Sequence, residues 1–368
     1  MSSRQPTVLW ALPLAVVVLF GARTAPAQSA AASPSDGPSV KVGTTIFADY
    51  TDTAEPKTLD SDGNPIHPNA FNIGRAYLNV SGRLSRLVSF RLTPDVTRET
   101  GSGSSLSGSL TFRLKYAFGQ LDLDRWVGAG SWVRIGAQQT PYVDYTEGIY
   151  RYRFQGTIFA EREGFLTSSD FGASAHWSLP RDYGDLHAGV YNGDGYSKSE
   201  PNDQKAFQVR GTLRPFPRNG AAKGLRLTAF YDGDHYVRSG PRRRLILGTT
   251  FEHRLANAGF EYLNGADQTS VTKAETRSSG WSLWATPKLR QVTESRWGLE
   301  ALARFDSLQP DESVDARRKR TIVGVAYWFP AAKGVSAAVL VDMDRATYDA
   351  PLARPREVRY AVHTLFSF

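Results

Sequence analysis

The basic side chains are the residues of this chain best suited to do chemistry. Arginines and one lysine recur at alternate positions of short apolar–polar segments, and three further arginines lie in one aromatic-rich connection. A guanidinium group matches the paired oxygens of phosphate or carboxylate, so the pattern is typical of anion binding. An open alternative is that the alternating cations are ordinary solvated charges balanced by Asp95, Glu300 and Asp306. The candidate anion-binding residues are Arg75, Arg91, Arg113, Lys115, Arg134, Arg151, Arg153, Arg162, Arg210, Arg226, Arg304 and Arg320.

Other kinds of site have little support in the sequence. The six histidines have no metal-type spacing, and no Ser/His/acid grouping is apparent. Residues 60–64 hint at a calcium loop, but Phe71 occupies the position where a bidentate glutamate would close it. We therefore expect no catalytic residues, no metal and no cofactor.

The alternation that places the cations also predicts strands. In residues 358–368 the apolar side chains fall at every second position, and the chain ends on Phe368. Leu365 is the one apolar residue on the opposite face. In residues 106–118 the apolar set Leu110, Phe112, Leu114, Tyr116 and Phe118 is expected on one face, with Arg113 and Lys115 on the other. A tilted strand of about 9–11 residues is long enough to cross a bilayer.

About sixteen segments carry this weak signature, and fourteen or eighteen strands stay open as alternatives. Together they predict an all-β fold, a transmembrane antiparallel β-barrel over residues 40–368. The segments are 40–50, 71–84, 87–97, 106–118, 131–139, 169–179, 186–192, 207–214, 225–231, 245–251, 256–263, 281–286, 297–305, 320–329, 335–341 and 358–368.

The connections differ in length on the two sides of the predicted membrane. If the chain starts in the periplasm, the connections 51–70, 140–168 and 193–206 are extracellular and long, whereas 85–86 and 180–185 are periplasmic and short. This asymmetry is the one expected of an outer-membrane barrel. The third extracellular loop, 140–168, is too aromatic for disorder, so we expect it to fold into the lumen as a constriction. An external lid or a subunit contact is the alternative.

The amino terminus has the three parts of a secretory signal. Arg4 is followed by an apolar run over residues 8–20 and by small residues at 25–27, so we expect cleavage after Ala27 and a flexible lead-in over 28–39. No other run of about 18 apolar residues occurs.

The formal charge is +8 and cysteine is absent. Export excludes nucleic acid as the reason for the basic excess, and the expected location is the bacterial outer membrane.

Several motifs resemble those of the phosphate-selective porin O and P family. They are RIGAQQTP at 134–141, ER at 161–162, SDFG at 169–172, GVYNGDG at 189–195, NDQKA at 202–206 and LRPF at 213–216. The likeness covers most of the mature chain but is dense only between about Arg134 and Phe216. It implies a homotrimeric sixteen-stranded pore whose third outer loop folds inward, with basic residues that pass anions from site to site.

One departure from the family pattern makes the pore architecture better supported than phosphate selectivity. The family commonly has a lysine just before the Thr-Pro, whereas this chain has Gln139, and residues 142–165 contain arginines but no lysine. We therefore expect a porin for small hydrophilic solutes with an anion preference that could include phosphate. The alternatives are a porin for neutral or organic solutes that slide along Tyr142, Tyr145, Tyr150 and Tyr152, or a plugged structural or enzymatic barrel.

The expected partners follow from this reading. They are small anionic or polar solutes, outer-membrane lipid, and lipopolysaccharide, whose phosphates could meet the basic runs 242–244 and 317–320. Phe368 is expected to present the chain to the barrel-insertion machinery.

Overall fold

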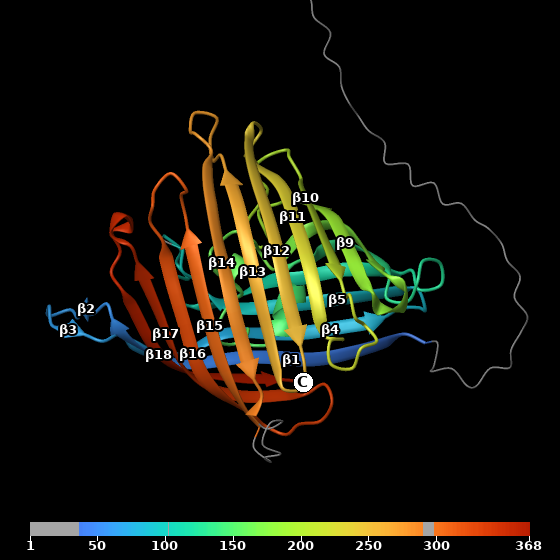
Figure 1. Cartoon of the computed structure of the whole chain (residues 1–368), viewed down its shortest axis with the longest axis horizontal. Coiled ribbons are helices and arrows are strands. Elements are labelled where there is room, and N and C mark those ends of the chain that lie inside the picture. Colours follow the sequence, from blue (N-terminus) through green and yellow to red (C-terminus); the bar gives the residue numbers. More distant parts are fainter. Residues whose placement is uncertain (1–36, 102, 290–297) are drawn as a thin grey trace, which may run out of the picture. The chain divides into compact units, whose positions relative to one another are not determined.

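The computed structural model describes residues 37–101, 103–289 and 298–368. Within them, sixteen antiparallel strands close into a barrel in which each strand bonds to the next along the chain and β1 bonds to β18 (Figure 1). The sixteen-stranded all-β barrel predicted from the sequence is confirmed. The barrel strands are β1 (Ser39–Glu55), β4 (Asn69–Arg83), β5 (Val88–Arg98), β6 (Leu110–Asp122), β7 (Trp132–Gln139), β8 (Ser169–Ser178), β9 (Gly184–Tyr191), β10 (Ala206–Leu213), β11 (Leu225–Val237), β12 (Gly240–Glu252), β13 (Ala256–Asp267), β14 (Thr276–Pro287), β15 (Leu299–Gln309), β16 (Arg318–Trp328), β17 (Ser336–Tyr348) and β18 (Glu357–Ser367).

Short elements lie in the connections of the described residues, among them two single 3-10 turns at Pro180–Asp182 and Ala350–Leu352. β2 (Thr58–Leu59) and β3 (Pro65–Ile66) form a small hairpin between β1 and β4. The helices α1 (Val143–Tyr150) and α2 (Phe159–Arg162) both belong to the connection between β7 and β8. The predicted signal peptide, 1–27, and nearly all of the lead-in lie outside the described residues, as does Trp297, the first residue of one predicted strand.

The last strand has the two faces expected from its alternation. Tyr360, Val362 and Phe366 point outward and are 51%, 39% and 52% exposed, respectively. Leu365, the apolar residue on the opposite face, is buried in a cluster inside the barrel. The strand closes the barrel through paired bonds of 3.1 Å between the backbone groups of Thr44 and Phe368.

The predicted faces of β6 are wrong beyond Leu114. Thr93 pairs with Tyr116 while Pro94 pairs with Leu114, so Lys115 is an extra residue in a β-bulge. Tyr116 and Phe118 therefore turn into the barrel and are only 3% and 8% exposed. The physical reason lies on the neighbouring strand, because Pro94 has no N–H to donate to the ladder and proline within a sheet is confined to edges and bulges.

A second bulge reverses the faces of β4. Phe47 pairs with Arg75 and Ala48 with Ile73, so Gly74 is the extra residue. Phe71 is 83% exposed on the outside, yet Arg75, an even number of residues further on, turns inward to the acids of the lumen. Strict alternation would have placed Arg75 in lipid, and the bulge is what makes its predicted inward position correct.

With one exception, the connections at the end predicted as extracellular are long. Long connections gather at the end opposite the two termini of the barrel, and we take this end as extracellular. The exception is the connection between β11 and β12, where the strands extend to Val237 and Gly240. The basic run 242–244 therefore lies inside β12, where its arginines pair with Asp234, Glu275 and Asp267.

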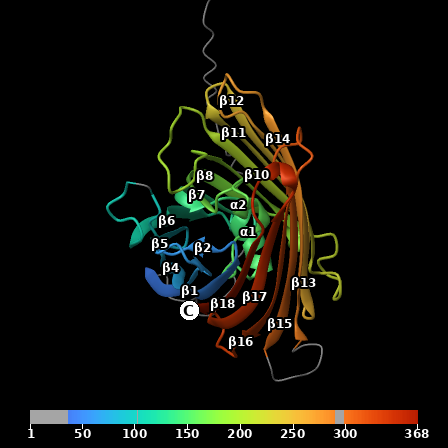
Figure 2. The ribbon, with the colours of Figure 1, turned by 90° about the vertical axis from the view of Figure 1, so that its left-hand side faces the viewer.

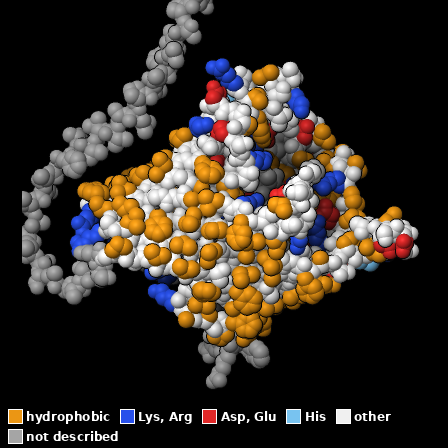
Figure 3. Space-filling view, turned by 180° about the vertical axis from the view of Figure 1, so that it is seen from behind, with side chains coloured by type: hydrophobic (Ala, Val, Ile, Leu, Met, Phe, Trp, Pro, Cys, Tyr) orange, Lys and Arg blue, Asp and Glu red, His pale blue; other side chains and the backbone are white. Residues whose placement is uncertain are grey.

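Apolar side chains cover the outer wall of the barrel (Figure 3). Phe112, Ile135 and Val341 are among them, with exposures of 76%, 70% and 56%. In the described part of the chain, no helix is long and apolar enough to span a membrane.

Candidate functional site

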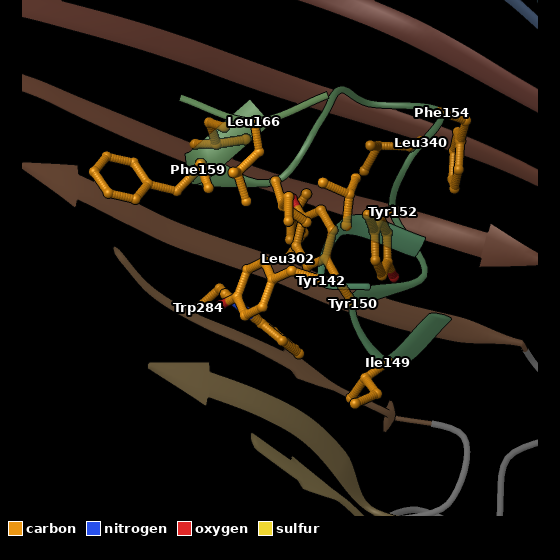
Figure 4. Close-up of a cluster of buried hydrophobic side chains, with 14 of the residues drawn as sticks. Tyr142, Ile149, Tyr150, Tyr152, Phe154, Phe159, Leu166, Trp284, Leu302 and Leu340 are labelled. Carbon is orange, nitrogen blue, oxygen red and sulfur yellow. The ribbon is translucent and has the colours of Figure 1, made fainter. Parts of the chain in front are cut away.

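The connection 140–168, called here the inner loop, folds into the barrel as predicted. Figure 2 shows α1 and α2 enclosed by the strands rather than above them. Three of its tyrosines pack on aromatic rings of the wall, with centroid distances of 5.3 Å for Tyr142–Phe230, 5.1 Å for Tyr150–Trp284 and 5.9 Å for Tyr152–Trp328. Figure 4 shows the three tyrosines and Trp284 gathered between the loop and the strands.

The burial of these rings removes them from any solute. Tyr142, Tyr150 and Tyr152 are 2%, 1% and 0% exposed. Each buried aromatic side chain contributes on the order of 2–3 kcal/mol to holding the loop against the wall. Tyr142, Tyr150 and Tyr152 are therefore the hydrophobic anchor of the loop. Tyr145, the fourth tyrosine expected to form a sliding surface, has its ring centroid 3.9 Å from the guanidinium carbon of Arg210.

Polar contacts hold the loop backbone and fix its position. Arg304 donates from Nη1 to the Thr157 carbonyl at 2.8 Å, and Arg210 donates from Nε to the Pro141 carbonyl at 2.7 Å. The hydroxyl of Tyr142 donates to Glu261 at 2.5 Å. Because loop carbonyls inside a barrel must be satisfied by side chains, these contacts select one loop conformation.

Two cavities remain on the other side of the loop, toward β1, β4–β6 and β16–β18. The inner cavity, nearer the periplasmic end, has a volume of about 670 Å³, and the outer cavity one of about 480 Å³. Phe47, Arg153 and Phe154 line both. The rings of Phe47 and Phe154 lie 6.5 Å apart and mark the boundary between the two cavities, which together are called here the passage.

Both cavities are lined by more cations than anions. The inner cavity has four basic side chains, Arg91, Lys115, Arg151 and Arg153, and two acidic ones, Asp144 and Glu147. The outer cavity has five basic side chains, Arg75, Arg153, Arg162, Arg320 and Arg359, and three acidic ones, Asp49, Asp342 and Asp344. Because the surrounding walls have a low dielectric constant, this excess focuses a positive potential on the passage.

Two of these cations, Arg91 and Lys115, form no salt bridge among the described residues, although the Asp144 carboxylate lies near enough to attract both. Arg91 donates to Thr93 and to the side-chain oxygen of Asn79, at 3.0 and 2.9 Å, and stacks on Tyr116. Lys115 lies 3.3 Å from the Tyr77 hydroxyl and is 5% exposed. The other basic residues of the two cavities pair with carboxylates, Arg75 with Asp95 at 3.3 Å and Arg320 with Asp344 at 2.6 Å, for example.

The loop faces these cations with two acids whose ionisation is disfavoured. Burial raises the pKa of Glu147 to about 8, against the opposing attraction of Arg153 at 2.8 Å. Burial also raises the pKa of Asp144, which accepts a hydrogen bond from Tyr116 at 3.0 Å. The negative charge of the loop therefore depends on pH near neutrality.

Two more of the predicted residues, Arg151 and Arg162, lie beside the cavities. Arg151 pairs with Glu300 at 3.3 Å, and Arg162 lies 3.9 Å from Asp344 at the outer cavity. Burial and the nearby charges of Arg304 and Arg320 lower the pKa of Arg162 to about 10. These two keep positions on the passage.

Arg210 and Arg304 lie under the inner loop and not on the passage. Both are 3% exposed, and they pair with Asp185 and Asp306. Arg113, Arg134 and Arg226 also line neither cavity: Arg113 pairs with Asp95, Arg134 stacks on Trp132, and Arg226 pairs with Glu252. Their geometry is that of wall and loop supports.

Sequence reasoning missed four residues of the passage. Arg359 and His363 line the outer cavity, and their alternation in β18 could have indicated it. Tyr77 and Trp328 line the inner cavity, but a tyrosine at a strand position reads equally well as a lipid-facing residue. Gln139, which stands where a lysine was expected, accepts a bond from Arg134 at 3.1 Å.

Comparison with known proteins is consistent with this architecture. The family model of the phosphate-selective porins O and P matches residues 40–301. The chain belongs to this family. It is therefore a porin of the outer membrane, a channel and not a member of an enzyme family. No curated protein matches the sequence significantly.

Solved porin structures share the fold at low sequence identity. An anion-selective porin from Comamonas acidovorans is 11% identical, with a TM-score of 0.61 over 90% of this chain and 100% of that one. OmpF of Salmonella typhi, in complex with daunomycin, is 12% identical with a TM-score of 0.61 over 90% and 98%. The outer-membrane channel DcaP of Acinetobacter baumannii is 11% identical with a TM-score of 0.58 over 90% and 98%.

Proposed function

We propose that this porin conducts small hydrophilic solutes with a preference for anions. The observation that carries the proposal is the pair Arg91 and Lys115, which line the inner cavity and form no salt bridge among the described residues. A buried cation that forms no salt bridge is costly, and an anion that enters the cavity lowers this cost. A cation in the same place meets repulsion from both residues.

The mechanism is passive and depends on weak contacts. An anion from outside first meets the paired arginines of the outer cavity, then Arg153 at the boundary, and then Arg91 and Lys115. The paired arginines attract it weakly because their carboxylates already compete for the guanidinium groups. Weak successive sites permit conduction, because an ion held too tightly would not leave.

Phosphate is one anion that this passage would accept. Guanidinium groups match its oxygens, and the family to which the chain belongs carries phosphate in its name. The inner loop, however, presents no lysine over 142–165, so we propose phosphate as a permeant anion rather than as the preferred one.

Liposome swelling with solutes of similar size but different charge tests the preference. Proteoliposomes should take up gluconate faster than glucose, and glucosamine slowest. If glucosamine entered as fast as gluconate, the unpaired cations would not control permeation and the anion preference would be refuted.

We further propose a homotrimer and three contacts with the surroundings. The trimer is supported by the family resemblance and by OmpT of Vibrio cholerae, one structure of which is described as a trimer form. The outer apolar wall would meet lipid, Arg243 of β12, whose side chain is half exposed, would face lipopolysaccharide, and Phe368 would present the chain for insertion. Native mass spectrometry in mild detergent should give three copies, and a monomer under the same conditions would contradict the trimer.

A further inference from the structure

The inner and outer cavities differ in their apolar lining. Phe47 and Phe154 line both, but the inner cavity adds Tyr77, Tyr116 and Trp328. The inner cavity therefore combines cations with several aromatic rings, whereas the outer cavity is lined mainly by ion pairs. A chloride or phosphate ion would use the cations of the inner cavity and leave its apolar wall in contact with water.

The cations of the inner cavity lie against these rings. The guanidinium carbon of Arg91 is 4.6 Å from the centroid of Tyr116, and Lys115 Nζ is 4.8 Å from that of Tyr77. Arg151 lies 4.3 Å from the ring of Trp328. Each charge is thus fixed beside an aromatic surface, so that one ligand can meet a cation with one end and a ring with the other.

We propose that the inner cavity is a binding site for organic anions that carry an aromatic ring, such as aryl carboxylates. The carboxylate would lie between Arg91 and Lys115, and its ring would pack against Tyr77, Phe47 and Phe154. The volume of about 670 Å³ is in the range of small-molecule sites. This inference rests on the proposed anion preference and specifies the class of anion that the porin binds best.

Block of the chloride current by small carboxylates tests the site. In a planar bilayer with the full chain, benzoate should half-block the current at about a tenfold lower concentration than acetate, because an aromatic contact and the burial of a ring add to the shared carboxylate contact. Equal half-blocking concentrations would overturn the inference. If the channel were anion-selective but blocked equally by both, the aryl site alone would fail; if it were cation-selective, the proposed function would fail as well.

A matched pair of variants at Tyr77 assigns the effect to the ring. Tyr77→Phe keeps the ring and should keep the tenfold difference, although Lys115 loses the hydroxyl 3.3 Å away. Tyr77→Leu removes the ring and should narrow the difference to about threefold or less. A Tyr77→Leu channel that still discriminates tenfold would refute this assignment, and the comparison in the unmodified chain stands if either variant fails to insert.

Discussion

The unpaired cations Arg91 and Lys115 offer the sharpest perturbation of this porin. Both lie beside the Tyr116 ring, with charged atoms 4.6 and 5.3 Å from its centroid. An anion held between the two cations at about 5 Å from each charge would be attracted by each with about 0.8 kcal/mol at the dielectric constant of water. The two together amount to about 1.7 kcal/mol, or roughly a 15-fold change in anion occupancy.

The variant that tests this magnitude replaces both cations by neutral residues that can still form hydrogen bonds. Arg91→Gln with Lys115→Gln should lower the chloride-to-potassium permeability ratio about tenfold, measured from the reversal potential in a potassium chloride gradient. The separations are shorter than the Debye length of about 10 Å at 0.1 M salt, so the effect should persist at that ionic strength.

A control with the same change in net charge separates local from global electrostatics. Arg226→Gln with Arg243→Gln removes two cations that pair with Glu252 and Glu275 and that line neither cavity. This control should change the permeability ratio by less than twofold. If the two double variants behaved alike, or if the first left the ratio within twofold of the unmodified chain, the reasoning from Arg91 and Lys115 would be refuted.

Three further predictions concern pH, the loop and the outer wall. Because burial raises the pKa of Glu147 to about 8, lowering the pH from 9 to 6 should neutralise it and increase anion selectivity, and Glu147→Gln should flatten this profile of reversal potential against pH. Arg304→Met should unpair Asp306 and free the Thr157 carbonyl, at a cost of about 3–5 kcal/mol, so single-channel noise and proteolysis within 140–168 should rise, whereas an unchanged recording would contradict the anchoring role. Val341→Arg should destabilise the folded barrel in urea titrations in lipid by about 2–4 kcal/mol, whereas the same substitution at Val271, exposed in the 268–275 connection, should have little effect.

The strands were predictable because a barrel wall imposes one rule on every segment. Lipid outside and water or loop inside require an alternation of period two, and the sixteen predicted segments each overlap one observed strand. Where a strand contains an extra residue, the residues beyond it point to the opposite faces from those that alternation predicts. Gly74 and Lys115 are such residues, and the local signals for the two bulges are the glycine itself and Pro94 on the strand opposite Lys115.

The inward position of the basic side chains was predictable, but which of them line the cavities was not. Alternation identifies inward arginines, but it does not say which of them the inner loop will cover. Arg210 and Arg304 are inward and buried under the loop, whereas Arg91 and Lys115 are inward and line the passage. Which arginines are covered depends on the strands against which the aromatic side chains of the loop pack. This packing arises from contacts such as Tyr150–Trp284, which join residues far apart in the sequence.

The most direct test of the anion preference is the reversal potential of the unmodified channel in a planar bilayer with a potassium chloride gradient. The account predicts a reversal potential on the chloride side, with current reduced when millimolar phosphate is added. A reversal potential on the potassium side would mean that Arg91 and Lys115 are neutralised in the working channel, and it would contradict the account.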